Sequence, residues 1–141
     1  MKILVAIDGS DSALRALSYV IAHRDFFSVN PELVLVNVHL PLPSVRAKTV
    51  LGSEVVERYY AEEAEAVLAP ARAMLEGKPC RVTEHAIVGQ PSTQIIATAK
   101  ADGCDLIVMG TQGRSAFGNL LMGSVAMRVI AESPLPVLSV K

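Results

Sequence analysis

The sequence is poor in aromatic residues and contains no tryptophan. Phe, Trp and Tyr together make up 4% of the 141 residues, whereas hydrophobic residues make up 51%. The apolar side chains are therefore mainly those of Val, Leu, Ile and Ala. A chain of this length and hydrophobic content can bury its own core, which excludes an intrinsically disordered protein. We expect a single domain that spans residues 1–141.

Cysteine and net charge are also scarce. Two cysteines, Cys80 and Cys104, are too few for a small protein stapled by disulfides. The 13 Lys and Arg residues are balanced by 14 Asp and Glu residues, which leaves a formal net charge of −1. This balance lacks the basic footprint of a nucleic-acid-binding protein. We therefore expect reduced thiols and no nucleic-acid partner.

No hydrophobic run is long enough to cross a membrane. The mean hydropathy of +0.40 is high for a soluble protein. However, the longest runs, at residues 3–7 and 33–38, fall far short of the roughly 20 residues that a membrane-spanning helix needs. The first run also meets Asp8 too early to be the apolar part of a signal peptide. We therefore expect a cytoplasmic protein with no membrane partner.

Short apolar runs alternate along the chain with longer amphipathic stretches. The runs predict strands at residues 3–7, 33–39, 80–88, 106–109 and 137–140. The run at residues 3–7 lacks polar alternation, which is typical of a strand that is buried on both faces of a parallel sheet, whereas residues 80–88 alternate. The stretches between them have helical spacing at about residues 11–24, 53–75, 92–101 and 124–132.

The second predicted helix contains a proline and a run of glutamates. Pro70 lies inside it, where the proline ring is expected to kink or break the helix. Glu62, Glu63 and Glu65 form an acidic run, which we expect on its solvated face.

The order of elements predicts an α/β fold. We expect a five-stranded parallel sheet, doubly wound and Rossmann-like, with helices on both faces and the strand order 3-2-1-4-5. Ligands of such sheets bind outside the carboxyl ends of the strands, where the winding direction reverses. In this order the first and fourth strands are neighbours, so Asp8 and Gly110 would flank one crevice.

A glycine-rich segment follows the fourth predicted strand. Two residues separate Gly110 from Gly113, and nine separate Gly113 from Gly123. Glycines permit positive φ and close approach to the backbone, so a phosphate could bind exposed N–H groups here. The helix that begins at Ser124 would add its N-terminus, and Arg114 could add a charge-assisted contact. The same pattern also fits a surface loop that binds nothing.

Two common phosphate motifs are excluded by the residues themselves. Gly113 and Gly118 have the spacing of a P-loop, but Asn119 and Leu120 stand where Lys and Ser or Thr are required. The first turn, which begins at Asp8, lacks the three glycines of a dinucleotide-binding fingerprint.

The three histidines, His23, His39 and His85, have no metal-ligand spacing. Only His39 falls near the predicted crevice, as either an ordinary residue at a strand end or a catalytic base.

The glycine pattern, Gly110-x2-Gly113-x9-Gly123-Ser124, resembles the nucleotide-binding signature of the ATP-binding branch of the universal stress protein family. The opening residues, from Ile3 to Ser10, resemble the first strand and acidic turn of the same family, and the resemblance covers essentially the whole chain. It implies a stress-response regulatory or sensing module that binds ATP or a related adenine nucleotide.

The resemblance also implies roles for individual residues. The nucleoside and ribose would be contacted by Ala6, Ile7, Asp8, Val38, Met109 and Gly110. The phosphates would be held by Gln112, Gly113, Gly123, Ser124 and Val125. Asp8 would act by a hydrogen bond to the nucleotide or through the hydration shell of a Mg²⁺ ion, unless it only starts a helix.

Two positions depart from the family pattern. Asn37 stands where many members have His, and Ala126 stands where a hydroxyl residue is often found, which would remove one phosphate contact. The resemblance further implies a homodimer formed through the last strand, Val137–Val140, which is an apolar edge that benefits from pairing.

Three functions remain open on the sequence. The first is a regulatory module that binds ATP, which is favoured because no general base or lysine clamp for phosphoryl transfer is evident. The second is a slow ATP hydrolase or self-phosphorylating enzyme, with Asp8 holding Mg²⁺ and Ser115 or Ser124 near the γ-phosphate. The third is a structural dimerising domain with an empty crevice, against which the glycine spacing argues.

Overall fold

The computed structural model describes residues 1–27, 30–42, 52–113 and 122–141 of the chain. Its centre is a sheet of five parallel strands in the order β3-β2-β1-β4-β5. The strands are β1 (Lys2–Ala6), β2 (Glu32–His39), β3 (Arg81–Val88), β4 (Leu106–Gly110) and β5 (Val137–Val140). The predicted fold class and strand order are therefore confirmed.

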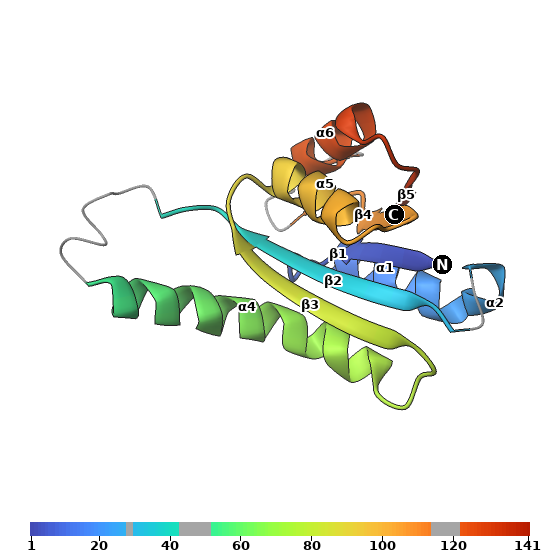
Figure 1. Cartoon of the computed structure of the whole chain (residues 1–141), viewed down its shortest axis with the longest axis horizontal. Helices are drawn as coiled ribbons and strands as arrows, with labels where there is room; N and C mark the ends of the chain where they lie inside the picture. Colours follow the sequence, from blue (N-terminus) through green and yellow to red (C-terminus); the bar gives the residue numbers. More distant parts are fainter. Residues whose placement is uncertain (28–29, 43–51, 114–121) are drawn as a thin grey trace.

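Helices cover both faces of this sheet (Figure 1). The helices are α1 (Asp11–Ala22), α2 (Arg24–Phe27), α4 (Ser53–Leu75), α5 (Pro91–Ala101) and α6 (Ser124–Glu132). The pair α1 and α4 packs on one face, and the pair α5 and α6 packs on the other. The winding reverses between β1 and β4, as the predicted order requires.

Alternate residues of the central strands enter two separate hydrophobic cores. In β1, Ile3 and Val5 pack with Leu17 of α1 and Leu68 of α4. Leu4, between them, belongs to the core beneath α5 and α6. All three β1 residues are fully inaccessible to solvent. Burial on both faces explains why the apolar runs contain no polar alternation.

The long helix α4 differs from the prediction at Pro70. The helix continues from Ser53 to Leu75 with Pro70 inside it, so the expected break does not occur. Pro70 and Ala66, whose carbonyl loses its usual donor, are both exposed. Water can therefore replace the missing backbone hydrogen bond on that side of the helix.

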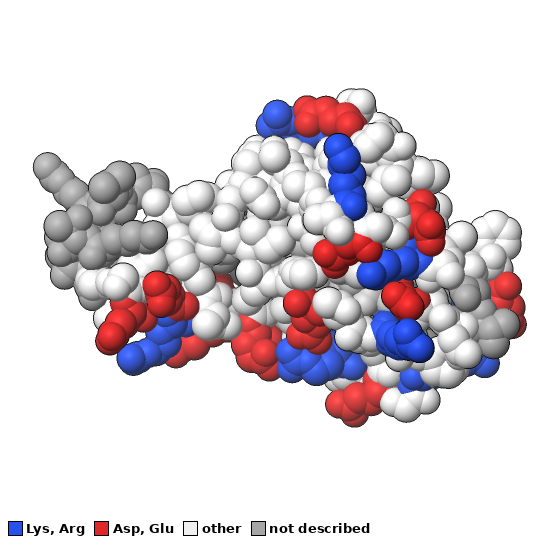
Figure 2. Space-filling model, viewed as in Figure 1, with Lys and Arg blue, Asp and Glu red and all other residues white. Residues whose placement is uncertain are grey.

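Charged side chains gather along α4 and the outer strand β3 (Figure 2). At this edge the guanidinium of Arg72 donates to Glu65 Oε1 over 2.9 Å and to Glu84 Oε2 over 2.8 Å. The hydrogen bond from Arg72 holds the pKa of Glu65 below its usual value. The other edge strand, β5, has four half-buried residues and pairs only with β4 in the part of the chain that the structure describes.

None of the helices in the described ranges has both the length and the apolar character to span a bilayer.

Candidate functional site

A cavity of about 540 Å³ opens at the carboxyl ends of β1, β2 and β4. Its walls continue onto α4, α5 and the first turn of α6. This is the place where the winding direction of the sheet reverses, and it is where doubly wound folds bind their ligands. The volume also falls within the range of about 300–1,000 Å³ that is usual for small-molecule sites.

The cavity brings together every predicted site residue that the structure describes. The members that line it are Ala6, Ile7, Asp8, Val38, Met109, Gly110, Gln112, Gly113, Gly123, Ser124 and Val125. Arg114 and Ser115 lie outside the described residues. Residues more than 100 positions apart in the sequence therefore form one continuous wall, because the parallel strands all end at the same edge.

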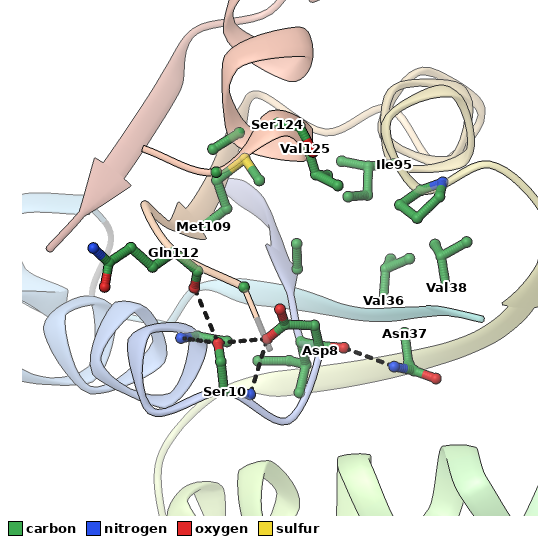
Figure 3. Close-up of a pocket in the computed structure, with 18 of the residues that line it drawn as sticks. Asp8, Ser10, Val36, Asn37, Val38, Ile95, Met109, Gln112, Ser124 and Val125 are labelled. Atoms are coloured by element: carbon green, nitrogen blue, oxygen red, sulfur yellow. Dashed lines mark hydrogen bonds between the residues drawn. The ribbon is translucent and has the colours of Figure 1, made fainter. Parts of the chain in front are cut away.

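The polar end of the cavity is organised by Asp8 and Ser10 (Figure 3). The backbone N–H and the hydroxyl of Ser10 donate to Asp8 Oδ1 over 2.9 and 2.6 Å, and Ala13 N–H donates to Ser10 Oγ over 3.2 Å. Ser10 therefore caps α1 while it holds the carboxylate. The Ser10 hydroxyl also lies 3.3 Å from the carbonyl oxygen of Gln112, which ties the turn after β1 to the turn after β4.

The glycines of this end are explained in part by packing. A Cβ atom on Gly110 would lie 2.6 Å from the backbone carbon of Ser12, and one on Gly113 would lie 2.9 Å from Asp8 Oδ2. Neither glycine has a positive φ, and neither does Gly123. A Cβ on Gly123 would meet only ordinary contacts, the nearest at 3.5 Å from the Thr111 carbonyl oxygen. Close packing against the backbone of Ser12 therefore requires glycine at position 110. A Cβ on Gly113 would meet only the end of the Asp8 side chain, which can shift, and position 123 has room for a Cβ atom.

The first turn of α6 presents backbone donors to the cavity. Gly123 is the N-cap, no side chain of the described residues caps the helix, and Ser124, Val125 and Ala126 all line the cavity wall. The first N–H groups of a helix have no partner within the helix, and they form the positive end of its dipole. An anion at this point would supply the missing acceptors.

One buried hydroxyl beside this turn also lacks a partner. Thr111 lines the cavity, is 8% exposed, and its Oγ1 makes no hydrogen bond among the described residues. Buried polar groups are nearly always paired, so this atom marks a polar position that the described part of the chain does not itself satisfy.

The opposite end of the cavity is apolar. Val36, Val38 and Ile95 lie together there, across the cavity from Asp8 (Figure 3). Asn37, between the two valines, is 6% exposed, and its Nδ2 donates to the Ile7 carbonyl oxygen over 2.9 Å. Its amide therefore holds the end of β1 against β2, which fixes the start of the turn that carries Asp8.

Helix α4 contributes a wall of the cavity that was not predicted. Glu63 and Val67 of this helix line the cavity, and Glu63 is half-buried, so its assignment to the solvated face is wrong. Glu62 and Glu65 are exposed as predicted. The spacing of Val56, Glu63 and Val67 places Glu63 on the apolar stripe of the helix, which is the signal that could have identified it.

His39 also lines the cavity beside this wall. Its ring meets those of Tyr59 and Tyr60 edge-on, at centroid distances of 5.8 and 5.1 Å, and the Tyr60 hydroxyl accepts from the Leu42 N–H over 2.8 Å. These contacts attach the end of β2 to α4 beside the cavity. His23 and His85 do not line the cavity, and His85 Nε2 lies 2.8 Å from Asp102 Oδ2 instead.

The described lining contains two carboxylates, Asp8 and Glu63, and no Lys or Arg. No group of three His, Cys, Asp or Glu side chains comes together as a metal site in the described ranges. A Mg²⁺ ion commonly binds through one or two carboxylates together with substrate phosphates and water. Asp8 lies at the polar end of the cavity, as does the first turn of α6. Its carboxylate could help to bind Mg²⁺ only if the ligand supplies phosphate oxygens as further ligands of the ion.

Comparisons with known proteins identify the family of the chain. The model of the universal stress protein family matches residues 1–141. A universal stress protein of Thermus aquaticus is 37% identical over 139 residues, which cover 99% of this chain and 97% of the relative. The solved structure of MJ0577, a protein of Methanocaldococcus jannaschii, superimposes with a TM-score of 0.85 at 31% identity, covering 99% of this chain and 94% of that one.

A further solved structure contains a ligand. The universal stress protein from Archaeoglobus fulgidus in complex with dAMP superimposes with a TM-score of 0.66 at 26% identity, covering 100% of this chain and 98% of that one. The matches in sequence and in structure extend over nearly the full length of each protein. The chain therefore belongs to the universal stress protein family.

Proposed function

We propose that this protein is a cytoplasmic regulatory module that binds ATP, together with Mg²⁺, in the cavity at the carboxyl ends of the strands. Adenosine would occupy the apolar end beside Val36, Val38 and Ile95, and the phosphates would lie against the first turn of α6. The dAMP held by the relative from Archaeoglobus fulgidus supports an adenine nucleotide as the ligand class.

The observation that carries this proposal is the uncapped N-terminus of α6. Its first turn lines a cavity whose other end is apolar, so a single molecule with a flat apolar part and an anionic part satisfies both ends. Mg²⁺, when bound, neutralises phosphate charge that would otherwise face the carboxylate of Asp8. Gln112, Gly113, Gly123, Ser124 and Val125 are the residues proposed to surround the phosphates, and Arg114 is proposed to add its charge.

The test is to identify what the purified protein carries and what it binds. Mild denaturation should release an adenine nucleotide if binding is tight, and added ATP with Mg²⁺ should raise the melting temperature of nucleotide-free protein. Absence of both a released nucleotide and a thermal shift would rule the proposal out.

Gly123→Val tests whether ATP binding can be blocked without destabilising the folded protein. The Cβ atom of the new side chain has room in the folded protein, because its nearest neighbour would lie at 3.5 Å, and the valine would occupy the space in front of the α6 donors. We expect ATP affinity to fall by roughly tenfold or more with little change in the melting temperature of the unliganded protein. Ala131→Val, at the exposed far end of the same helix, is the matched control and should bind ATP normally.

The proposal includes a homodimer formed through β5. This edge strand has four half-buried residues and a free side in the described chain, and a second copy could pair with it. Pro136 and Val140 turn their carbonyl oxygens to β4, so the backbone N–H of Ser139 faces the free edge. Sedimentation of the wild type and of Ser139→Pro would test the dimer, because proline removes a donor needed for pairing at that edge. A wild type that sediments as a monomer at all concentrations would contradict the dimer but not ATP binding.

A further inference from the structure

A second cavity, of about 340 Å³, lies at the opposite end of the sheet. It is bordered by the end of α1, the start of β2, the end of α4 and the turn that leads into β3. None of its lining residues belongs to the cavity at the carboxyl ends, so the two are separate sites. Its volume lies near the lower end of the usual range for ligand sites.

The floor of this amino-end cavity is hydrophobic. Val20 of α1, Leu33 of β2 and Leu75 of α4 form it, and they are 1%, 2% and 6% exposed. All three belong to the core between the sheet and the pair α1 and α4. Cys80, which precedes β3, also lines the cavity and is half-buried, with a free thiol. The cavity is therefore an opening onto the main core, and an apolar group placed there would be removed from water on a preformed surface.

The rim of the same cavity carries two cations and no carboxylate. Arg24 and Lys78 are both among the lining residues, and both are exposed. Arg24 Nε lies 3.9 Å from Asp25 Oδ1, but the Asp25 side chain is 91% exposed, so this ion pair is weak. Lys78 has no ion pair among the described residues. Two cations beside an apolar floor attract an anion that also has a hydrophobic part.

We propose that the amino-end cavity binds a small amphipathic anion, of the class of medium-chain fatty acids. Its carboxylate would meet Arg24 and Lys78, and its hydrocarbon chain would lie over Val20, Leu33 and Leu75. The limited volume selects a chain of medium length rather than a full-length membrane lipid. The proposal is independent of nucleotide binding, because the two cavities share no residue.

The thiol of Cys80 provides the assay. Burial raises the pKa of Cys80, so alkylation by iodoacetamide is followed at mildly alkaline pH. Peptide mass spectrometry distinguishes Cys80 from Cys104, which is 5% exposed and serves as the internal control for unfolding. Decanoate, titrated from micromolar to millimolar concentrations, should slow the alkylation of Cys80 saturably and leave that of Cys104 unchanged.

Two sets of variants test the geometry. Combined Arg24→Glu and Lys78→Glu should weaken protection by decanoate roughly tenfold. Lys100→Glu, at an exposed position of α5 outside the cavity lining, should not change it. Ala22→Phe places a large side chain at an exposed lining position and should abolish protection without altering the circular dichroism melting curve.

Three results would overturn the proposal. The first is the absence of saturable protection in a protein with a normal melting curve. The second is equal protection by decanol, which would show that the cations do not contribute. The third is an equal effect of the rim variants and of Lys100→Glu. An adenine nucleotide that binds normally in these experiments would leave the proposed function intact whichever result is obtained.

Discussion

The turn before β3 and the last residue of β4 lie at opposite ends of the sheet, and each position requires glycine for a different reason. Gly77, at the amino end, has φ of +70° and no atom within 4 Å of the position that a Cβ would take. Gly110, at the carboxyl end, has an ordinary φ, but its Cβ would lie 2.6 Å from the backbone of Ser12. Glycine is therefore required at position 77 for backbone conformation and at position 110 for close packing.

The two cavities also differ in the groups that would bind an anion. At the carboxyl ends, the described lining has no Lys or Arg, and its donors for an anion are backbone N–H groups of α6. At the amino ends, the donors are the side chains of Arg24 and Lys78. Backbone donors are held in place by the helix and sheet, whereas exposed side chains must be ordered when the ligand binds. If both proposed ligands bind, one sheet offers a rigid anion site at one end and an adaptable anion site at the other.

The largest expected effect concerns Gly110. Gly110→Ala should lower the free energy of unfolding by about 3 kcal/mol, because the added methyl group meets backbone atoms of Ser12 that cannot rotate away. Urea denaturation of the unliganded protein measures it. A loss of unfolding free energy smaller than that caused by Gly77→Ala would contradict the conclusion that close packing at Gly110 costs more to disturb than the backbone conformation at Gly77.

A smaller effect is expected at Gly77. Gly77→Ala should cost about 1 kcal/mol, because an L side chain is strained at positive φ even where space is free. Gly77→Asn should cost less, since Asn tolerates the left-handed region better than Ala. The same denaturation experiment distinguishes the two, and equal losses for Ala and Asn would remove the conformational explanation.

The smallest expected effect is in the response to salt. Raising NaCl from about 50 to 500 mM should weaken decanoate binding roughly threefold more than ATP binding, because exposed side-chain charges are screened more than a partly buried helix terminus. Calorimetric titration of each ligand at both concentrations provides the measurement. Equal salt dependence of the two ligands would mean that the cavities do not recognise anions by different means.

Much of the fold could be predicted because it depends on local patterns. The buried runs in β1 and β4 have no polar alternation, and burial on both faces of a parallel sheet produces that pattern directly. Pro70 could not be judged in the same way. Its effect depends on which side of α4 faces solvent, and that is decided by how the helix docks on the sheet.

The site was predictable where it follows the strand ends, and less so elsewhere. Asp8 and Gly110 meet because parallel strands end at one edge, so the topology alone places them together. The crowding of Gly110 could not be predicted, because it comes from Ser12, which is distant in sequence. Glu63 was missed because an acidic run is usually solvated, although its place on the apolar stripe indicated otherwise.

The central position of β1 has a consequence for the order in which the protein can fold. β1 is the first of the five strands to leave the ribosome, yet it pairs with β2 on one side and with β4, about 100 residues later, on the other. Its apolar residues remain without one neighbour until most of the chain has been synthesised. Long-range parallel pairing of this kind slows folding and lengthens the exposure of an aggregation-prone segment. β1, whose apolar residues are fully buried in the native protein, is thus the strand whose apolar residues stay exposed for longest during synthesis.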